Sequence, residues 1–102
     1  MNGSIARLSR WFQAHCDGTR EHSHGITIAT TDNPGWWVKI DLASTHLAAR
    51  PFAEVAEGVD AARHPRADSW LSCRVIDEVW NGAGSPDRLD DILQCFLDWA
   101  GA

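Results

Sequence analysis

Four side chains that could bind a metal ion lie close together near the start of the chain: His15, Cys16, His22 and His24. Zinc needs three or four such ligands that converge on one tetrahedral site. His15 and Cys16 are neighbours and would point about 100° apart on a helix. His22 and His24 would share one side of an extended segment and could supply two ligands. Surface or capping histidines are the simpler interpretation, so we expect no bound metal and no cofactor.

Two further groups contain the residue types of a phosphate-binding or catalytic site. Gly82-Ala83-Gly84-Ser85 precedes a predicted helix, but it lacks a lysine, and Asp87 would repel an anion. The glycines are therefore predicted to form a turn. The three cysteines form no C-x-x-C pair, and Cys73 is expected to point into the core. Acidic pairs such as Asp77-Glu78 are more typical of a solvated surface than of an acid/base couple. We therefore expect no enzymatic activity.

The composition is that of one globular domain, residues 1–102. Of the 102 residues, 44% are hydrophobic, which is enough to form one buried core, and 23% are charged. The formal net charge of −5 makes nucleic acid an unfavourable partner, because affinity for phosphates comes from cationic side chains. No apolar run has the length of a membrane span, and Met1–Ser4 lacks the features of a signal peptide. We expect a cytoplasmic protein that binds no membrane.

Hydrophobic periodicity predicts a helix at each end of the chain. The apolar stripe of the first helix contains residues at three- and four-residue spacing: Ile5, Leu8, Phe12 and Cys16. The second helix is predicted to begin at Ser85, a natural N-cap before Pro86. Leu93 and Phe96 lie on its apolar face, and aspartates lie on the other face.

Strands are predicted between the two helices. Residues 24–43 alternate between apolar and polar side chains around an Asp-Asn-Pro-Gly turn, a pattern typical of a β-hairpin. Residues 70–79 predict a further strand, and residues 52–57 fit a short strand or a helical turn, with a strand preferred. Two amphipathic helices can both bury their stripes only on one face of a small antiparallel sheet. The predicted fold is therefore α+β, with about four strands and the N- and C-terminal helices packed on one face.

This arrangement leaves the other side of the sheet, called here the open face, in contact with solvent. The residues expected on it are Trp37, Lys39 and Asp41, with Trp70 and Arg74 nearby. Neighbours on a strand point to opposite faces, so Trp36 and Trp37 cannot both lie in the core. A large aromatic side chain beside charged residues is typical of an interface anchor. The alternative is that the loop of residues 58–69 covers Trp37.

Several motifs are similar to those of a known family. They are Glu21-His22-x-x-Gly25-Ile26, Asp32-Asn33-Pro34-Gly35-Trp36, Ile40-Asp41-Leu42 with Thr45, and Gly82-Ala83-Gly84 followed by Leu89, Ile92-Leu93, Phe96 and Trp99. From Trp11 to Trp99 the chain resembles the immunity protein 53 family, small cytosolic proteins encoded beside toxins of bacterial polymorphic toxin systems. A tryptophan commonly precedes the Glu-His pair in the family pattern, whereas this chain has Arg20, so that aromatic role does not carry over.

The resemblance implies a protein that binds one cognate toxin domain and blocks it without catalysis. We expect the open face and adjoining loops to contact the toxin through Glu21, His22, Trp37, Lys39, Asp41, Trp70 and Arg74. Many toxin effectors are nucleases with basic clefts, toward which an acidic inhibitor would be steered. The protein would be a monomer or a homodimer. One alternative is a small histidine/cysteine metal protein or enzyme, as the sulfurtransferase label given to some members would imply; another is a homodimeric structural domain.

Overall fold

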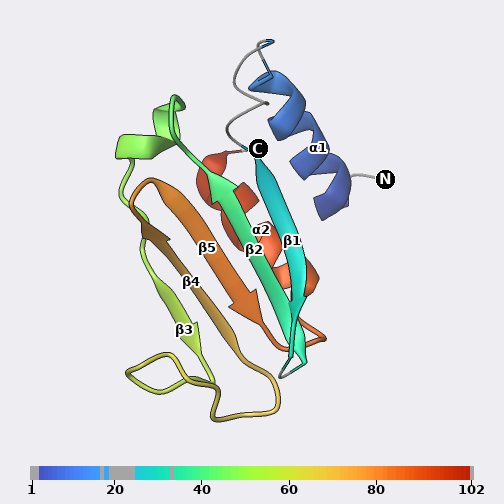
Figure 1. Cartoon of the computed structure of the whole chain (residues 1–102), viewed down its shortest axis with the longest axis vertical. Helices are drawn as coiled ribbons and strands as arrows, with labels where there is room; N and C mark the ends of the chain where they lie inside the picture. Colours follow the sequence, from blue (N-terminus) through green and yellow to red (C-terminus); the bar gives the residue numbers. More distant parts are fainter. Residues whose placement is uncertain (1–2, 17, 19–24, 33, 102) are drawn as a thin grey trace.

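In the described residues, five antiparallel strands form one sheet, and two α-helices pack against one of its faces (Figure 1). This computed structural model describes residues 3–16, 18, 25–32 and 34–101. The elements, in chain order, are α1 (Ser4–Ala14), β1 (Ile26–Thr31), β2 (Gly35–Asp41), the 3₁₀-helix η2 (His46–Ala49), β3 (Val55–Glu57), β4 (Leu71–Ile76), β5 (Val79–Gly84) and α2 (Leu89–Ala100). The strands lie in the order β1-β2-β5-β4-β3, so the last strand in the sequence is the central one. The predicted α+β class is confirmed.

The central strand β5 was not predicted, so the expected four strands become five. It pairs with β2 on one side and with β4 on the other. The two-residue turn between β4 and β5 has positive φ at both positions, 50° at Asp77 and 63° at Glu78. These are the signs of a type I′ turn, whose twist matches that of a β-hairpin. Gly82 and Gly84 are therefore strand residues, and the interpretation of this glycine-rich segment as a turn is wrong.

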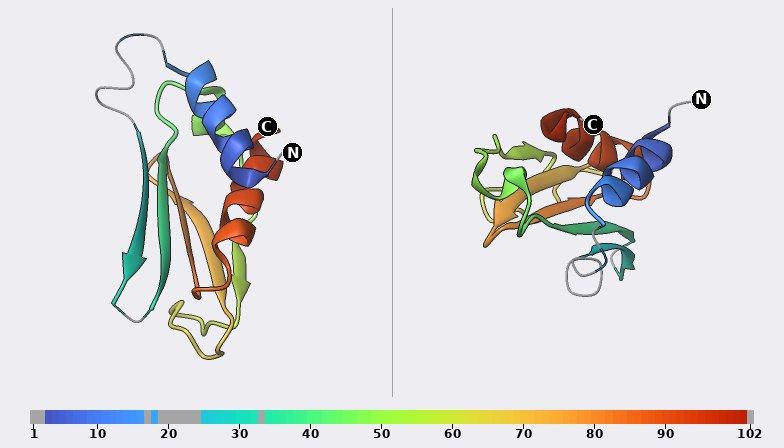
Figure 2. Two further views of the ribbon diagram at one scale, coloured as in Figure 1. Left: turned by 90° about the vertical axis from the view of Figure 1, so that its right-hand side faces the viewer. Right: turned by 90° about the horizontal axis from the view of Figure 1, so that it is seen from above.

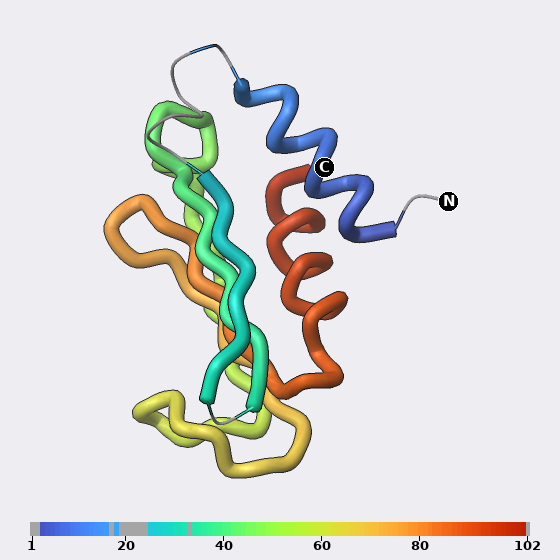
Figure 3. Tube along the Cα trace, turned by 45° about the vertical axis from the view of Figure 1, so that its right-hand side comes forward, coloured from blue at the N-terminus to red at the C-terminus, as the bar shows by residue number. Residues whose placement is uncertain are grey.

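The core lies between the sheet and α2, with α1 beside α2 (Figures 2 and 3). The indole of Trp80 on β5 is fully buried and meets the ring of Phe96 on α2 edge-on, with 5.4 Å between the ring centroids. Trp11 of α1 contacts the same Phe96 ring, with 5.0 Å between centroids. Phe96 therefore links both helices to the sheet. This packing confirms that the two helices share one face.

The first helix is rotated relative to the predicted stripe. Its buried residues are Ser4, Leu8 and Trp11. Ile5, expected in the core, is 60% exposed, and Cys16 is exposed beyond the end of the helix. The rotation places the large Trp11 indole against Phe96 of α2 and so buries more apolar area than Ile5 would. Neither α-helix of the described chain has the length and apolar sequence that a membrane span requires.

The last helix begins one turn later than predicted. Its first residue is Leu89, and Ser85 is not its N-cap. The hydroxyl of Ser85 instead donates to Asp87 and accepts a hydrogen bond from the backbone N–H of Trp70 at 3.1 Å. Ser85 therefore ties the connection between β5 and α2 to the start of β4. Sequence spacing alone could not distinguish this role from helix capping, because both satisfy a backbone N–H group.

Candidate functional site

The register of the sheet determines which side chains share the open face. Trp37 of β2 pairs with Ala83 of β5, which pairs in turn with Ser72 of β4. Residues directly opposite one another in antiparallel strands point to the same side, so these three form one row across the sheet. The adjacent row contains three residues with hydrogen-bond donors: Lys39, Asn81 and Arg74.

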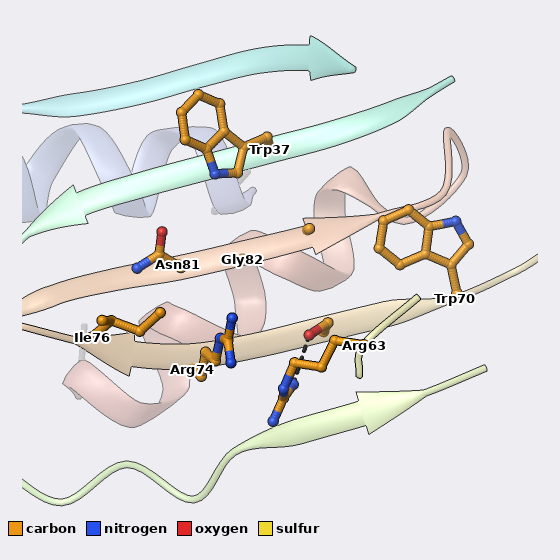
Figure 4. A pocket seen from close by; sticks show the side chains of 9 residues that line it. Trp37, Arg63, Trp70, Arg74, Ile76, Asn81 and Gly82 are labelled. Carbon is orange, nitrogen blue, oxygen red and sulfur yellow. Dashed lines mark hydrogen bonds between the residues drawn. The ribbon is translucent and has the colours of Figure 1, made fainter. Parts of the chain in front are cut away.

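A hollow of about 240 Å³ lies on the open face among these residues (Figure 4). Small residues of β4 and β5 line it: Ser72, Gly82 and Ala83. The indoles of Trp37 and Trp70 rise beside them, one from β2 and one from the residue before β4. The sheet surface is hollowed because the side chains between these two indoles are short.

Trp37 remains accessible at this hollow. Its side chain is 37% exposed, so the loop of residues 58–69 does not bury it. The ammonium group of Lys39 lies 4.9 Å from the centroid of the Trp37 ring, within range of a cation–π contact. The neighbouring Trp36 faces the helices, and its Nε1 donates to the carbonyl of Pro86 at 3.1 Å. The two consecutive tryptophans thus lie on opposite faces, as the alternation predicted.

Trp70 is held in place by its backbone. Its N–H donates to Ser85 Oγ, and its carbonyl accepts from the N–H of Ser85, each at 3.1 Å. Its ring lies against the backbone of Gly35, because a Cβ built on that glycine would lie 3.5 Å from Trp70 Cζ2. The two hydrogen bonds to Ser85 therefore fix the backbone of Trp70, and the close approach of Gly35 leaves room for its indole.

Arg63 brings the loop of residues 58–69 to the rim of the hollow. Its Nη1 donates to Ser72 Oγ at 2.6 Å and to the carbonyl of Val55 at 3.0 Å. Its Nη2 donates to Glu54 Oε1 at 2.5 Å. Residues 58–69 were predicted only as a loop, and Arg63 was not among the predicted site residues. No local pattern marks this residue, because its partners come together only when β3 pairs with β4.

The open face carries basic side chains although the chain as a whole is acidic. On the open face, Lys39 and Arg74 form no ion pair with any described residue. Asp41 lies on the same face and accepts from the N–H of Ala43 at 2.9 Å. The helices on the opposite side carry both signs of charge, with two arginines on α1 and three aspartates on α2: Arg7, Arg10, Asp90, Asp91 and Asp98. The open face therefore has a cationic area although the whole chain has a net charge of −5.

Comparison with known proteins gives the family. A sequence model for immunity protein 53 matches residues 5–101, nearly the whole chain. The chain belongs to the immunity protein 53 family. The resemblance carried by the Glu-His, Asp-Asn-Pro-Gly-Trp and C-terminal motifs is thereby confirmed. No curated protein and no solved structure matches the chain significantly.

The structure of this immunity protein 53 family member does not describe two of the residues that were expected to bind the toxin. Glu21 and His22 lie outside the described residues, as does His24. The other five expected residues are described, and the strand pairing and the hollow bring them to the open face or its rim: Trp37, Lys39, Asp41, Trp70 and Arg74.

The structure also places several of the other groups that were considered for chemistry. No group of three His, Cys, Asp or Glu side chains among the described residues could hold a metal ion. His15 is engaged locally, with Nδ1 2.8 Å from the carbonyl oxygen of Trp11. Hydrogen bonding to the Cys95 thiol, together with burial, raises the pKa of Cys73 above its usual range. A thiol with a raised pKa is a poor nucleophile, and Cys73 is fully buried in the core, where the sequence predicted it.

Proposed function

We propose that this immunity protein neutralises one cognate toxin domain by binding it through the open face, without catalysing a reaction. Membership of the immunity protein 53 family supports a role that depends on binding a toxin. The observation that supports the open face is Trp37, whose indole is 37% exposed at the edge of the hollow. Exposed aromatic side chains that enter or border pockets dominate binding energy at many protein interfaces.

The composition of the open face also favours protein binding. Trp37, Trp70 and Ile76 contribute apolar area around the hollow, and Ile76 is 42% exposed. Lys39 and Arg74 supply charged groups next to that apolar area. Protein interfaces commonly combine a core rich in aromatic residues with a polar rim. A five-stranded sheet stiffened by two helices presents these groups with little conformational entropy to lose on binding.

Three further residues extend the proposed surface. Asp41 lies on the open face at the end of β2, beyond Lys39 in the same strand. Glu21 and His22 precede β1 in the sequence, and β1 is the edge strand next to β2. In this proposal these three residues also contact the toxin, and the toxin loses activity because its own working surface is covered.

The proposal is tested with Trp37→Ala and the toxin domain encoded beside the gene for this protein. We expect a loss of about 2 kcal/mol in binding free energy, or about 30-fold in Kd, by isothermal titration calorimetry. Ile28→Ala is the matched control, because Ile28 is 38% exposed but pairs with buried Val38 on the helix side of the sheet. The control should bind like the wild type.

Three outcomes contradict the proposal. They are absence of binding by the wild-type protein, equal affinities of wild type and Trp37→Ala, and unfolding of Trp37→Ala as seen by circular dichroism. Protection of cells that express the toxin gives a second measurement, in which Trp37→Ala should protect less than Ile28→Ala. Sedimentation at the concentrations used for calorimetry separates toxin binding from a homodimer that uses the open face.

A further inference from the structure

Three side chains with hydrogen-bond donors form a row across the open face. Lys39 on β2, Asn81 on β5 and Arg74 on β4 are directly paired across the sheet. Asn81 Nδ2 donates to the carbonyl of Val79 at 3.0 Å, and Lys39 lies over the Trp37 ring. Arg74 is exposed and forms no side-chain hydrogen bond or ion pair with any described residue. Its guanidinium group is therefore available to an acceptor from outside the chain.

The hollow adjoins this row. Arg74 and Asn81 are among its lining residues, together with the indoles of Trp37 and Trp70 (Figure 4). A group that enters the hollow therefore meets aromatic rings and guanidinium and amide donors at once. A glutamate or aspartate side chain suits this environment, because its methylene stem can pack on an indole while its carboxylate accepts hydrogen bonds. Arginine binds carboxylates with two parallel hydrogen bonds, which adds geometric specificity.

We infer that the hollow receives an acidic segment of the toxin and that Arg74 binds a carboxylate of that segment, with Lys39 and Asn81 beside it. This inference rests on the proposed function and names the chemistry of its partner. The net charge of −5 suggested a basic cleft on the toxin, whereas this inference predicts an acidic segment at the contact. Charges in solution are screened within about 8 Å at physiological ionic strength, so the local charge at the contact decides complementarity.

A single-stranded nucleic acid is the competing occupant, since bases stack on aromatic rings and phosphates bind arginine. Its many phosphates would also meet the acidic remainder of a chain with a net charge of −5. One toxin carboxylate needs only the local donors around Arg74. The observations therefore favour an acidic protein segment, and nucleic acid becomes an outcome of the test.

The test measures how toxin affinity depends on the charge at residue 74. Arg74→Ala should weaken binding about 10- to 30-fold, and Arg74→Glu should weaken it more, because it adds repulsion to the lost hydrogen bonds. Arg74→Lys should recover part of the loss, since it restores the charge without the planar fork. Arg10→Glu is the matched control: Arg10 is exposed on α1, and the same charge reversal there should change affinity less than about threefold.

The outcomes separate this inference from the proposed function. If the wild-type protein binds no toxin, the proposed function and this inference fail together. If Trp37→Ala weakens binding but Arg74→Ala and Arg74→Glu do not, only this inference is overturned. It is also overturned if a single-stranded oligonucleotide binds in an Arg74-dependent manner while toxin binding is independent of Arg74. Restored binding between Arg74→Glu and a toxin variant with one acidic residue changed to lysine supports it directly.

Discussion

Ile92 of α2 packs directly on the backbone of Gly82 in the central strand. A Cβ built on Gly82 would lie 2.5 Å from Ile92 Cγ2 and 2.7 Å from two atoms of the Trp80 ring. Both of these neighbours are fully buried, so neither can move into solvent to make room. The absence of a side chain at Gly82 therefore sets how closely the helix approaches the sheet.

Gly82→Ala should destabilise the fold. The added methyl group overlaps Ile92 and Trp80, and overpacking of this kind costs about 1–3 kcal/mol in the free energy of unfolding. Urea denaturation measures the change. Gly25→Ala is the control, because a Cβ there would have no neighbour within 4 Å. Similar midpoints for Gly82→Ala and the wild type would show that α2 can shift away from β5.

Gly82 also explains why the sequence did not reveal β5. The strand reads Val-Trp-Asn-Gly-Ala-Gly, and asparagine and glycine are depleted in strands, so the segment resembles a turn. Its extended conformation depends on pairing with β2 and β4, which are distant in sequence from each other. The strands with regular alternation, residues 26–31 and 35–41, were predicted within the wider segment 24–43.

The candidate site, like the fold, could be predicted only where it depends on alternation within one strand. Alternation within β2 was enough to place Trp37 and Lys39 opposite to Trp36. Asn81 could not be found, because its position beside Arg74 depends on the unrecognised central strand. Arg63 could not be predicted from the sequence either, because its contact with Ser72 forms only when the loop folds against β4.

Arg63→Ala should loosen the rim of the hollow. The variant loses hydrogen bonds to Ser72 and to the carbonyl of Val55, and the free energy of unfolding should fall by about 1–3 kcal/mol. Chemical denaturation measures this loss, and limited proteolysis should cut within residues 58–69 more rapidly. Arg66→Ala is the control, because Arg66 is 67% exposed and its ion pair with Asp60 should contribute less than about 1 kcal/mol. Equal losses for the two variants would contradict the assigned role of Arg63.

Asp87 should contribute to the pH dependence of stability. Hydrogen bonds from the hydroxyls of Ser85 and Ser69 hold the pKa of Asp87 below its ordinary value of 3.8. A carboxyl group with a lowered pKa in the folded state stabilises the fold fully above 3.8, and this contribution is lost as the pH falls through the lowered pKa. Asp87→Asn should therefore show a shallower fall in Tm on acidification.

Thermal unfolding between about pH 6 and about pH 2 measures that difference. Asp68→Asn is the control, because Asp68 is exposed and accepts no hydrogen bond from a described side chain. Parallel Tm curves for Asp87→Asn and the wild type below pH 3.8 would contradict the proposed contribution.

The cysteines should react at very different rates in the folded protein. Cys16 is exposed, whereas Cys73 is fully buried, and its pKa is raised by the Cys95 thiol and by burial. Thiolates react with disulfide reagents far faster than thiols do, so Cys73 should stay unmodified while the protein is folded. Titration with a chromogenic disulfide should modify Cys16 first and reach Cys73 only in denaturant. Rapid modification of Cys73 in the native Cys16→Ser variant would show that the core opens readily.

Strand β5 joins the two halves of the sheet. Strands β1 and β2 form one half, strands β4 and β3 form the other, and only β5 pairs with both. During synthesis both halves leave the ribosome before Gly84 does, and α2, which covers the core, follows later still. Long-range strand pairing must wait until the late segment is available. A nascent chain in which β5 and α2 are still missing should consequently lack both the central strand of the open face and the helix that covers the core.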